Sequence, residues 1–205
     1  MRTFIAVELP DAVRQRVMKQ QQALAARLRE QSVDRCIRWT AVENLHLTLR
    51  FLGETDSAAC AGVDTALAAI AQTHAPFRLA LNGLGCFPGF RRPNIVWLDF
   101  QGDLPQLQQL QQSVEQAVQA NGFAAEPRSF KPHLTIGRAQ RSAKSYLLER
   151  AGNVIRQAEE SRSQRAPSPL ATFTIDTVVF MQSELQRSGP IYTPVAVYTL
   201  AGKAS

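Results

Sequence analysis

Two tetrapeptides in the chain repeat a pattern that could carry out acid–base chemistry. His46-Leu47-Thr48-Leu49 recurs 87 residues later as His133-Leu134-Thr135-Ile136. Successive side chains of a β-strand point to opposite faces, so each copy predicts a histidine and a threonine on one face and two apolar side chains on the other. A single copy would fit a half-buried strand with a hydrogen-bonded histidine. The duplication instead indicates two similar halves that bring both His-Thr faces to one groove.

These side chains match the needs of a phosphodiester displacement. An imidazole with an unperturbed pKa near ~6.5 can act as base in one copy and as acid in the other. The hydroxyls of Thr48 and Thr135 can donate hydrogen bonds to an anion between them. Arginine would add positive charge: Arg50 is expected on the face of His46, whereas Arg138 is out of phase with the second copy unless Gly137 bulges. The prediction is a metal-independent reaction in which a base activates water and an acid protonates the leaving oxygen.

Other common chemistries lack their motifs. The chain has no G-x-x-x-x-G-K-[ST] phosphate-binding loop, no K-x-D-G adenylation motif and no H-E-x-x-H. Neither motif histidine begins H-x-x-x-D, because Arg50 and Gly137 occupy the fifth positions. Two distant histidines without clustered carboxylates make a poor zinc site, so neither metal nor cofactor is expected. The third histidine, His74, is expected to be an ordinary surface or turn residue.

Composition places the chain among ordinary globular proteins. Its 205 residues fit one domain, and no apolar run reaches the ~18 residues of a membrane span. Three cysteines, an odd number without a CxxC pair, favour a reducing cytoplasm. The net charge of +6 points to an anionic partner, and residues 138–165 hold seven Lys and Arg against three Glu, a net +4. That segment fits either a solvated helix and loop or a rim that attracts phosphates.

Hydrophobic periodicity predicts an α+β fold with antiparallel sheet. Helices are expected where apolar residues recur at helical spacing: 13–28, 60–70, 107–118 and 147–158. Strands are expected at 4–9, 46–52, 77–84, 95–100, 133–137, 173–181 and 194–200. A stretch rich in Ser, Arg, Gln and Pro, 160–169, is expected to be a mobile loop.

The sequence resembles the 2H phosphoesterase superfamily, in particular the bacterial and archaeal RNA 2′,3′-cyclic phosphodiesterases, also called 2′-5′ RNA ligases. The resemblance covers nearly the whole chain. It rests on the two tetrapeptides and on segments around them: residues 2–10, Trp39, 43–54, 85–88, 93–98, 130–138, 180–185 and 189–192.

The resemblance implies a single bilobal domain over residues 1–205, with two pseudo-symmetric antiparallel sheets, flanking helices and a central groove. It implies hydrolysis of a terminal 2′,3′-cyclic phosphate to a 2′-phosphate. His46 would be the proton donor, and His133 would be the base that activates water. Thr48 and Thr135 would hold the phosphate oxygens, and Arg138 would contact the phosphate.

The implied partners are RNA with cyclic phosphate ends or cyclic nucleotides, bound by a monomer without an obligate protein partner. Run in reverse, the same site could join a cyclic-phosphate end to a 5′-hydroxyl without ATP. A non-catalytic protein that binds RNA ends in the same groove is the alternative. Several aromatic residues could stack on a base, with Phe130 as the first expectation, and Arg50 is a second candidate for substrate binding.

Overall fold

Alternating apolar residues build two antiparallel sheets in the computed structural model of the chain, which describes residues 1–165, 168–186 and 189–203. One sheet has four strands in the order β3-β1-β8-β9, and the other has five in the order β2-β6-β5-β4-β7. The first contains β1 (Arg2–Glu8), β3 (His46–Glu54), β8 (Thr177–Gln186) and β9 (Gly189–Thr199). The second contains β2 (Ile37–Trp39), β4 (Phe77–Phe87), β5 (Ile95–Gly102), β6 (His133–Ala139) and β7 (Ala171–Ile175).

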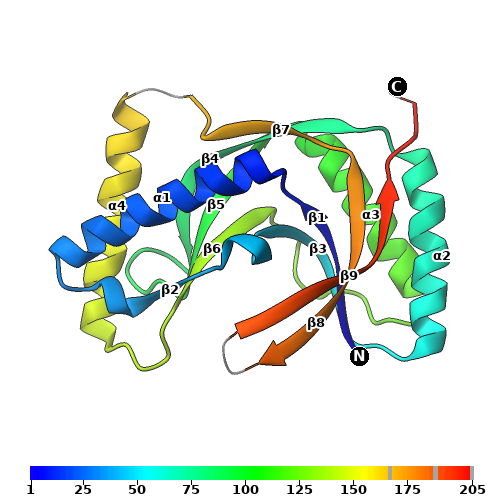
Figure 1. Cartoon of the computed structure of the whole chain (residues 1–205), viewed down its shortest axis with the longest axis horizontal. Coiled ribbons are helices and arrows are strands. Elements are labelled where there is room, and N and C mark those ends of the chain that lie inside the picture. The colour runs from blue at the N-terminus through cyan, green and yellow to red at the C-terminus, as the bar shows by residue number, and fades with distance from the viewer. Residues whose placement is uncertain (166–167, 187–188, 204–205) are drawn as a thin grey trace.

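Four helices flank the sheets in two pairs at opposite ends of the molecule (Figure 1). One pair, α1 (Asp11–Glu30) and α4 (Ser145–Arg165), packs beside the five-stranded sheet. The other pair, α2 (Ser57–Thr73) and α3 (Leu104–Ala120), packs beside the four-stranded sheet. The carboxylate of Asp56 caps α2 by accepting from the N–H of Ala59. Two short 3₁₀ turns, η1 (Asp34–Cys36) and η2 (Val42–Asn44), flank β2.

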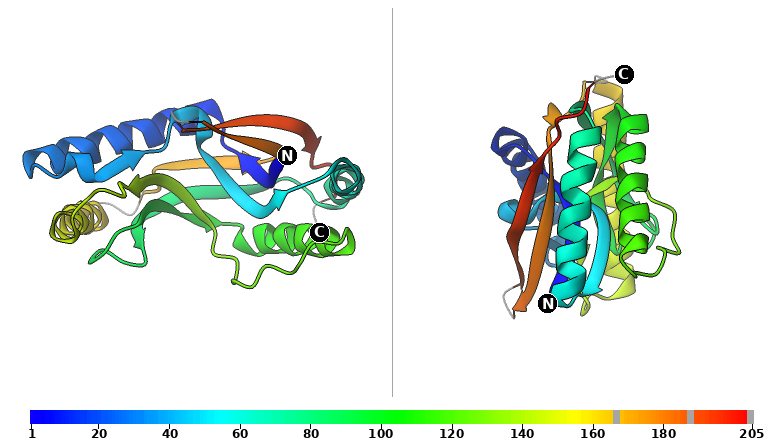
Figure 2. Two further views of the ribbon diagram at one scale, coloured as in Figure 1. Left: turned by 90° about the horizontal axis from the view of Figure 1, so that it is seen from below. Right: turned by 90° about the vertical axis from the view of Figure 1, so that its right-hand side faces the viewer.

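Two of the four helices contact the sheet opposite to the one that they follow in the chain. Helix α1 follows a strand of the four-stranded sheet but contacts β7, whereas α3 follows a strand of the five-stranded sheet but contacts β3. The two sheets form layers when the molecule is seen edge-on (Figure 2). A continuous apolar core joins both sheets and all four helices, with Leu47 and Leu134 of the motifs fully buried in it. The apolar faces of the motif strands therefore anchor their polar faces, and β3 and β6 lie against each other.

The predicted α+β class with antiparallel sheets is confirmed, and all predicted helices and strands lie within observed ones, apart from one or two residues at strand ends. Three details differ. The run 173–181 is two strands, because the chain passes at Asp176 from the five-stranded sheet to the four-stranded one. The short strand β2 was not predicted. The predicted loop is wrong for 160–165, which continue α4, while residues 166–167 lie outside the described ranges.

No helix among the described residues combines the length and the apolar composition needed to cross a membrane.

Candidate active site

The two motif strands have the same backbone irregularity at the same place. On β3, Arg50 pairs with Ile5 and Thr48 pairs with Ala6, so Leu49 is an extra residue. On β6, Gly137 pairs with Val96 and Thr135 pairs with Trp97, so Ile136 is an extra residue. A β-bulge of this kind shifts the alternation of side chains by one. The residues that return to the histidine face are Phe51 in the first copy and Arg138 in the second, again 87 residues apart.

The bulge corrects the prediction for Arg50. Regular alternation would place Arg50 beside His46, but its side chain is turned inward and is only 9% exposed. Its guanidinium pairs with Glu115 at 2.6 Å and with Glu126 at 3.2 Å, and it donates to the carbonyl of Ala124. Arg50 therefore lies outside the groove and fastens β3 to α3 and to the loop that leads into β6.

The same bulge resolves the phase of Arg138. Gly137 allows the close approach of β2, because a side chain there would meet Ile37 at 2.9 Å and Trp39 at 3.1 Å. The exposed side chain of Arg138 lies on the face of His133 and Thr135. The sequence predicted that Arg138 would share the face of His133 only if the strand bulged near Gly137, and the observed bulge agrees with that condition.

Each motif histidine is held by the carbonyl two residues before it. His46 Nδ1 donates to the carbonyl of Asn44 at 2.8 Å, and His133 Nδ1 donates to the carbonyl of Lys131 at 2.7 Å. A carbonyl only accepts, so the proton is on Nδ1 in both neutral rings. Nε2 of each ring is then the nitrogen left for proton transfer.

The surroundings of the two rings differ. His46 is packed against Phe4 and Tyr192, with ring centroids at 4.9 and 5.1 Å. Burial, together with the positive charge of Arg138, lowers the pKa of His46 to about 4, so the ring is neutral near pH 7. Among the described residues, His133 forms one aromatic contact, a perpendicular one with Phe87 at a centroid distance of 5.0 Å.

Both His-Thr pairs open into one cavity of about 360 Å³. The hydroxyls of Thr48 and Thr135 make no hydrogen bond to any other described residue, which leaves them free to donate to a ligand. The lining comes from β2, η2, β3, β6 and β9: Arg38, Trp39, Thr40, Ala41, Glu43, Asn44, His46, Thr48, Phe51, His133, Thr135, Arg138, Gly189, Pro190, Ile191 and Tyr192.

Positive charge predominates in this cavity. Arg38 and Arg138 face each other directly across the β2–β6 ladder, and neither forms an ion pair within the described part of the chain. Glu43 is the one carboxylate in the lining. Two guanidinium groups beside two hydroxyls make a cradle for a compact anion.

The sequence missed Arg38, because a three-residue strand gives little periodicity. The nearest residue that the sequence analysis singled out was the neighbouring Trp39, which is part of the family resemblance. Phe130 packs against the core from the loop before β6, and the structure does not bring it into the cavity. The aromatic side chains that line the cavity are instead Trp39, Phe51 and Tyr192. His74 lies directly after α2, contacts Ser113 Oγ at 3.0 Å and does not line the cavity, in agreement with its prediction as a surface or turn residue.

Within residues 1–165, 168–186 and 189–203, no three His, Cys, Asp or Glu side chains gather into a group that could hold a metal ion. The three cysteines are unpaired.

Comparisons with known proteins agree with this geometry. Residues 9–187 match the model of the 2′-5′ RNA ligase superfamily. An RNA 2′,3′-cyclic phosphodiesterase of Methanothermobacter thermautotrophicus is 30% identical over 201 residues, which are 98% of this chain and 99% of that protein. One of Archaeoglobus fulgidus is 30% identical over 198 residues, 97% of this chain and 99% of that protein.

Solved structures share the fold. TT0787 of Thermus thermophilus aligns over 100% of both chains with a TM-score of 0.75 and 24% identity. E. coli LigT complexed with 3′-AMP aligns over 97% of both chains with a TM-score of 0.71 and 22% identity. The bilobal fold expected from the resemblance is confirmed, and so is the expectation of an enzyme of this family. By its full-length relatives and by the match over 9–187, the chain belongs to the 2′-5′ RNA ligase superfamily.

Proposed function

We propose that the protein hydrolyses the 2′,3′-cyclic phosphate at the 3′ end of RNA to a 2′-phosphate. The observation that carries the proposal is the meeting of both His-Thr pairs in one cationic cavity, each histidine fixed in the same tautomer by a backbone carbonyl. Relatives of full length that carry the name RNA 2′,3′-cyclic phosphodiesterase support the assignment.

The reaction needs one base and one acid. In the proposed reaction, His133 Nε2 takes a proton from water, and the water oxygen forms a new bond to phosphorus. The bond from phosphorus to O3′ breaks, and His46 supplies a proton to that leaving oxygen. Thr48 and Thr135 donate to the non-bridging oxygens, and Arg138 balances the charge that grows on them in the transition state.

The low pKa of His46 in the protein alone adds a step to this reaction. A donor must hold a proton, and the lowered pKa keeps His46 neutral near pH 7. The cyclic phosphate brings a negative charge to the same cavity, and a nearby opposite charge raises the pKa of an imidazole. We therefore propose that His46 gains its proton as the substrate binds.

Every side chain in the proposed reaction comes from a single chain, which is compatible with action as a monomer. Reversal of the same steps would join a cyclic-phosphate end to a 5′-hydroxyl. The energy would come from the cyclic phosphodiester, so no nucleotide triphosphate is needed. The unpaired cysteines fit a reducing compartment such as the cytoplasm.

The test is turnover of 2′,3′-cyclic mononucleotides and of RNA with a cyclic end in the presence of chelator, with products identified by mass and ³¹P NMR. We expect a 2′-phosphate from the wild type. His46→Ala and His133→Ala should each lose about 10³-fold in rate while keeping the wild-type circular dichroism spectrum. Tight binding of cyclic-ended RNA without turnover would favour the non-catalytic RNA-end binder, and full activity of either variant would refute the proposed site.

A further inference from the structure

The turns that follow the two motif strands are counterparts of opposite charge. Strand β3 ends at Glu54 and the chain then turns into α2 through Asp56, whereas after β6 it turns into α4 through Arg141 and Lys144. At the spacing of 87 residues, Arg141 corresponds to Glu54. The two halves therefore differ in sign at the same sequence distance from their motifs.

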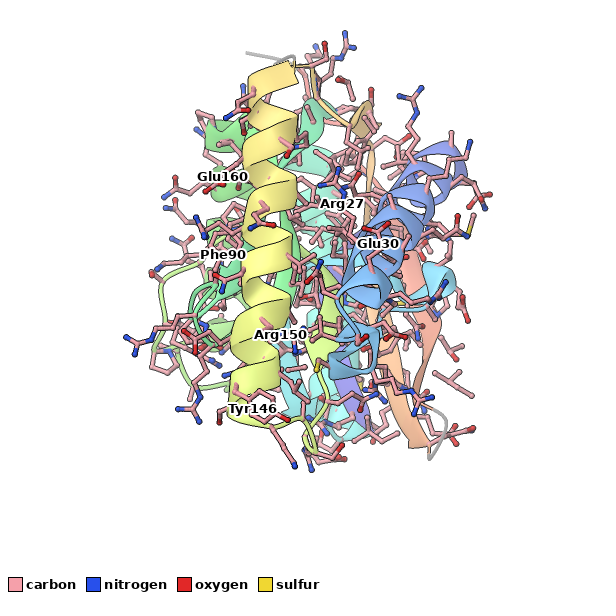
Figure 3. All side chains as sticks on the ribbon, turned by 90° about the vertical axis from the view of Figure 1, so that its left-hand side faces the viewer. Arg27, Glu30, Phe90, Tyr146, Arg150 and Glu160 are labelled. Atoms are coloured by element: carbon pink, nitrogen blue, oxygen red, sulfur yellow. The ribbon has the colours of Figure 1, made fainter. Side chains whose placement is uncertain are left out.

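The β4–β5 loop extends this positive charge. Its two ends are held together, because Asn94 N–H donates to the carbonyl of Phe87 at 2.8 Å, and one end is held to the motif strand β6, because Ala139 N–H donates to the carbonyl of Asn94 at 2.9 Å. Figure 3 shows Phe90 of this loop beside α4. The loop packs so closely there that a Cβ on Gly152 would overlap the carbonyl of Phe90. The loop therefore has a fixed place between the active site and α4.

A second, open hollow of about 480 Å³ lies between this loop and the start of α4. Its lining includes Arg91, Arg92, Ser145 and one carboxylate, Glu149. The lining of the hollow includes Pro88, which directly follows Phe87, and the ring of Phe87 lies against His133 with centroids 5.0 Å apart. One residue thus links the second hollow to the active site.

Five cations form what we call the basic surface: Arg91, Arg92, Arg138, Arg141 and Lys144. All five are exposed, and none forms an ion pair within the described part of the chain. The segments that carry them, 88–94 and 138–144, contain no Asp or Glu.

The other described cations of 138–165 are engaged with the protein itself. Arg150 donates to the carbonyl of Gln31, Arg156 pairs with Glu160, and Arg162 pairs with Glu159. The side chain of Arg165 lies outside the described part of the chain. Among the described side chains of 138–165, the cations without a partner are therefore at the start of the segment, which follows the second motif.

We propose that the basic surface binds the phosphates of the single-stranded RNA that precedes the cyclic end, with the second hollow as a subsite for an upstream nucleotide. The inference rests on the proposed function. A cyclic phosphate is the last group at the 3′ end, so every other nucleotide must leave the cavity in the 5′ direction. The strand leaves past Arg138 because each of its phosphates is attracted by the basic surface, whereas the corresponding turn of the opposite half offers the carboxylate of Asp56.

The experiment compares a cyclic mononucleotide with a single-stranded RNA of about ten nucleotides that ends in a cyclic phosphate. The variants are Arg141→Gln/Lys144→Gln and Arg91→Gln/Arg92→Gln. The matched control, Lys19→Gln/Lys203→Gln, removes two exposed charges that line neither hollow. We expect KM for the oligonucleotide to rise by roughly tenfold in the first two variants at ~0.1 M salt. The slope of log KM against log salt should fall by about 1.4, since each single-strand phosphate contact contributes ~0.7.

In those variants KM for the mononucleotide and kcat for both substrates should stay at the wild-type values. Glu149→Gln should lower KM for the oligonucleotide alone. An equal loss on both substrates, no loss on the oligonucleotide, or an equal loss in the control would each overturn the proposal. If the wild type turned over neither substrate, the proposed function would fail. Fluorescence anisotropy with labelled cyclic-ended RNA would then test whether the basic surface binds RNA, by comparing the affinities of the same variants.

Discussion

The two halves of this protein have the same backbone design. In each half, a carbonyl two residues upstream holds the histidine, at Asn44 and at Lys131. In each half, a bulge directly after the His-Thr pair brings a later residue back to the active-site face. These features recur at a spacing of 87 residues, so the geometry of the site is duplicated as a unit.

The halves differ in the environment that they give to this shared geometry. His46 is enclosed by aromatic rings, which lowers its pKa, and the residue beyond its bulge is Phe51. The residue beyond the bulge of His133 is Arg138, and the turn that follows is basic. A few positions thus turn a symmetric frame into a site with an aromatic side and a cationic side. Such a site can bind a nucleotide in one orientation, with its nucleobase on the aromatic side and its phosphate on the cationic side.

The largest expected effect tests the division of labour between the histidines. A substrate whose bridging O3′ is replaced by sulfur has a leaving group that departs without a proton, because a thiol is far more acidic than an alcohol. With this substrate, His46→Ala should regain most of the ~10³-fold that it loses with the oxygen substrate. His133→Ala should lose a similar factor with both substrates. The measurement is single-turnover rate, with thiolate release followed spectroscopically.

The reverse pattern would assign His133 as the proton donor and His46 as the base. Because the pKa of His46 is lowered in the protein alone, this is a demanding test of the proposed roles.

The next effect concerns the residue just after each bulge. Arg50→Ala removes the one cationic partner of the partly buried Glu115 and one of the two cationic partners of Glu126, and should lower the free energy of unfolding by about 3 kcal/mol. In the other half, Gly137→Ala forces a Cβ against Ile37 and Trp39 and should cost about 2 kcal/mol. Urea unfolding measures both. Arg156→Ala is the control, since its exposed pair should contribute less than ~1 kcal/mol. A loss at Arg50 no larger than this control would show that the ion pairs do not stabilise the bulge.

A third prediction separates the two residues that the bulges present. Arg138→Gln should reduce kcat/KM by about 100-fold for every cyclic phosphate, because it removes a charge from the transition state. Phe51, which is 58% exposed in the cavity wall, is expected to stack on the base instead. Phe51→Ala should raise KM by roughly tenfold for cyclic nucleotides. It should leave a base-free ribose cyclic phosphate unaffected, and an equal effect on that substrate would rule out stacking.

The smallest effect is the shift of a pKa. NMR titration of His46 in the free protein should give a value of about 4. Saturating inorganic phosphate should raise it by about one unit or more, because the anion favours the protonated ring. A higher pKa in the complex means proton uptake on binding, so phosphate affinity should increase as the pH falls through the pKa of the complex towards that of the free protein, about 4. An unchanged pKa would show that the anion does not lie beside His46.

Much of the fold could be predicted from the sequence because period-3.6 and period-2 patterns mark helices and half-buried strands. The patterns failed where they were short or interrupted. Strand β2 is too brief to show a period, and the run 173–181 gave no sign that it changes sheets at Asp176. The polar end of α4 was predicted as a loop because its residues lack an apolar stripe, although Glu159 ties this helix to β4 by accepting from Leu84 N–H.

The sequence by itself determined the duplicated pairs, their common face and the family, since these depend only on residue identity and strand periodicity. The tertiary structure decided which residues join them. One extra residue in each strand turned Arg50 into the interior and brought out Phe51 and Arg138, which a regular alternation cannot foresee. It also joined Arg38, the β4–β5 loop and the start of α4, which lie far apart in sequence, into two hollows of positive charge. The net charge of a segment does not say where its side chains lie in space, because their positions depend on how the two sheets and the helices pack.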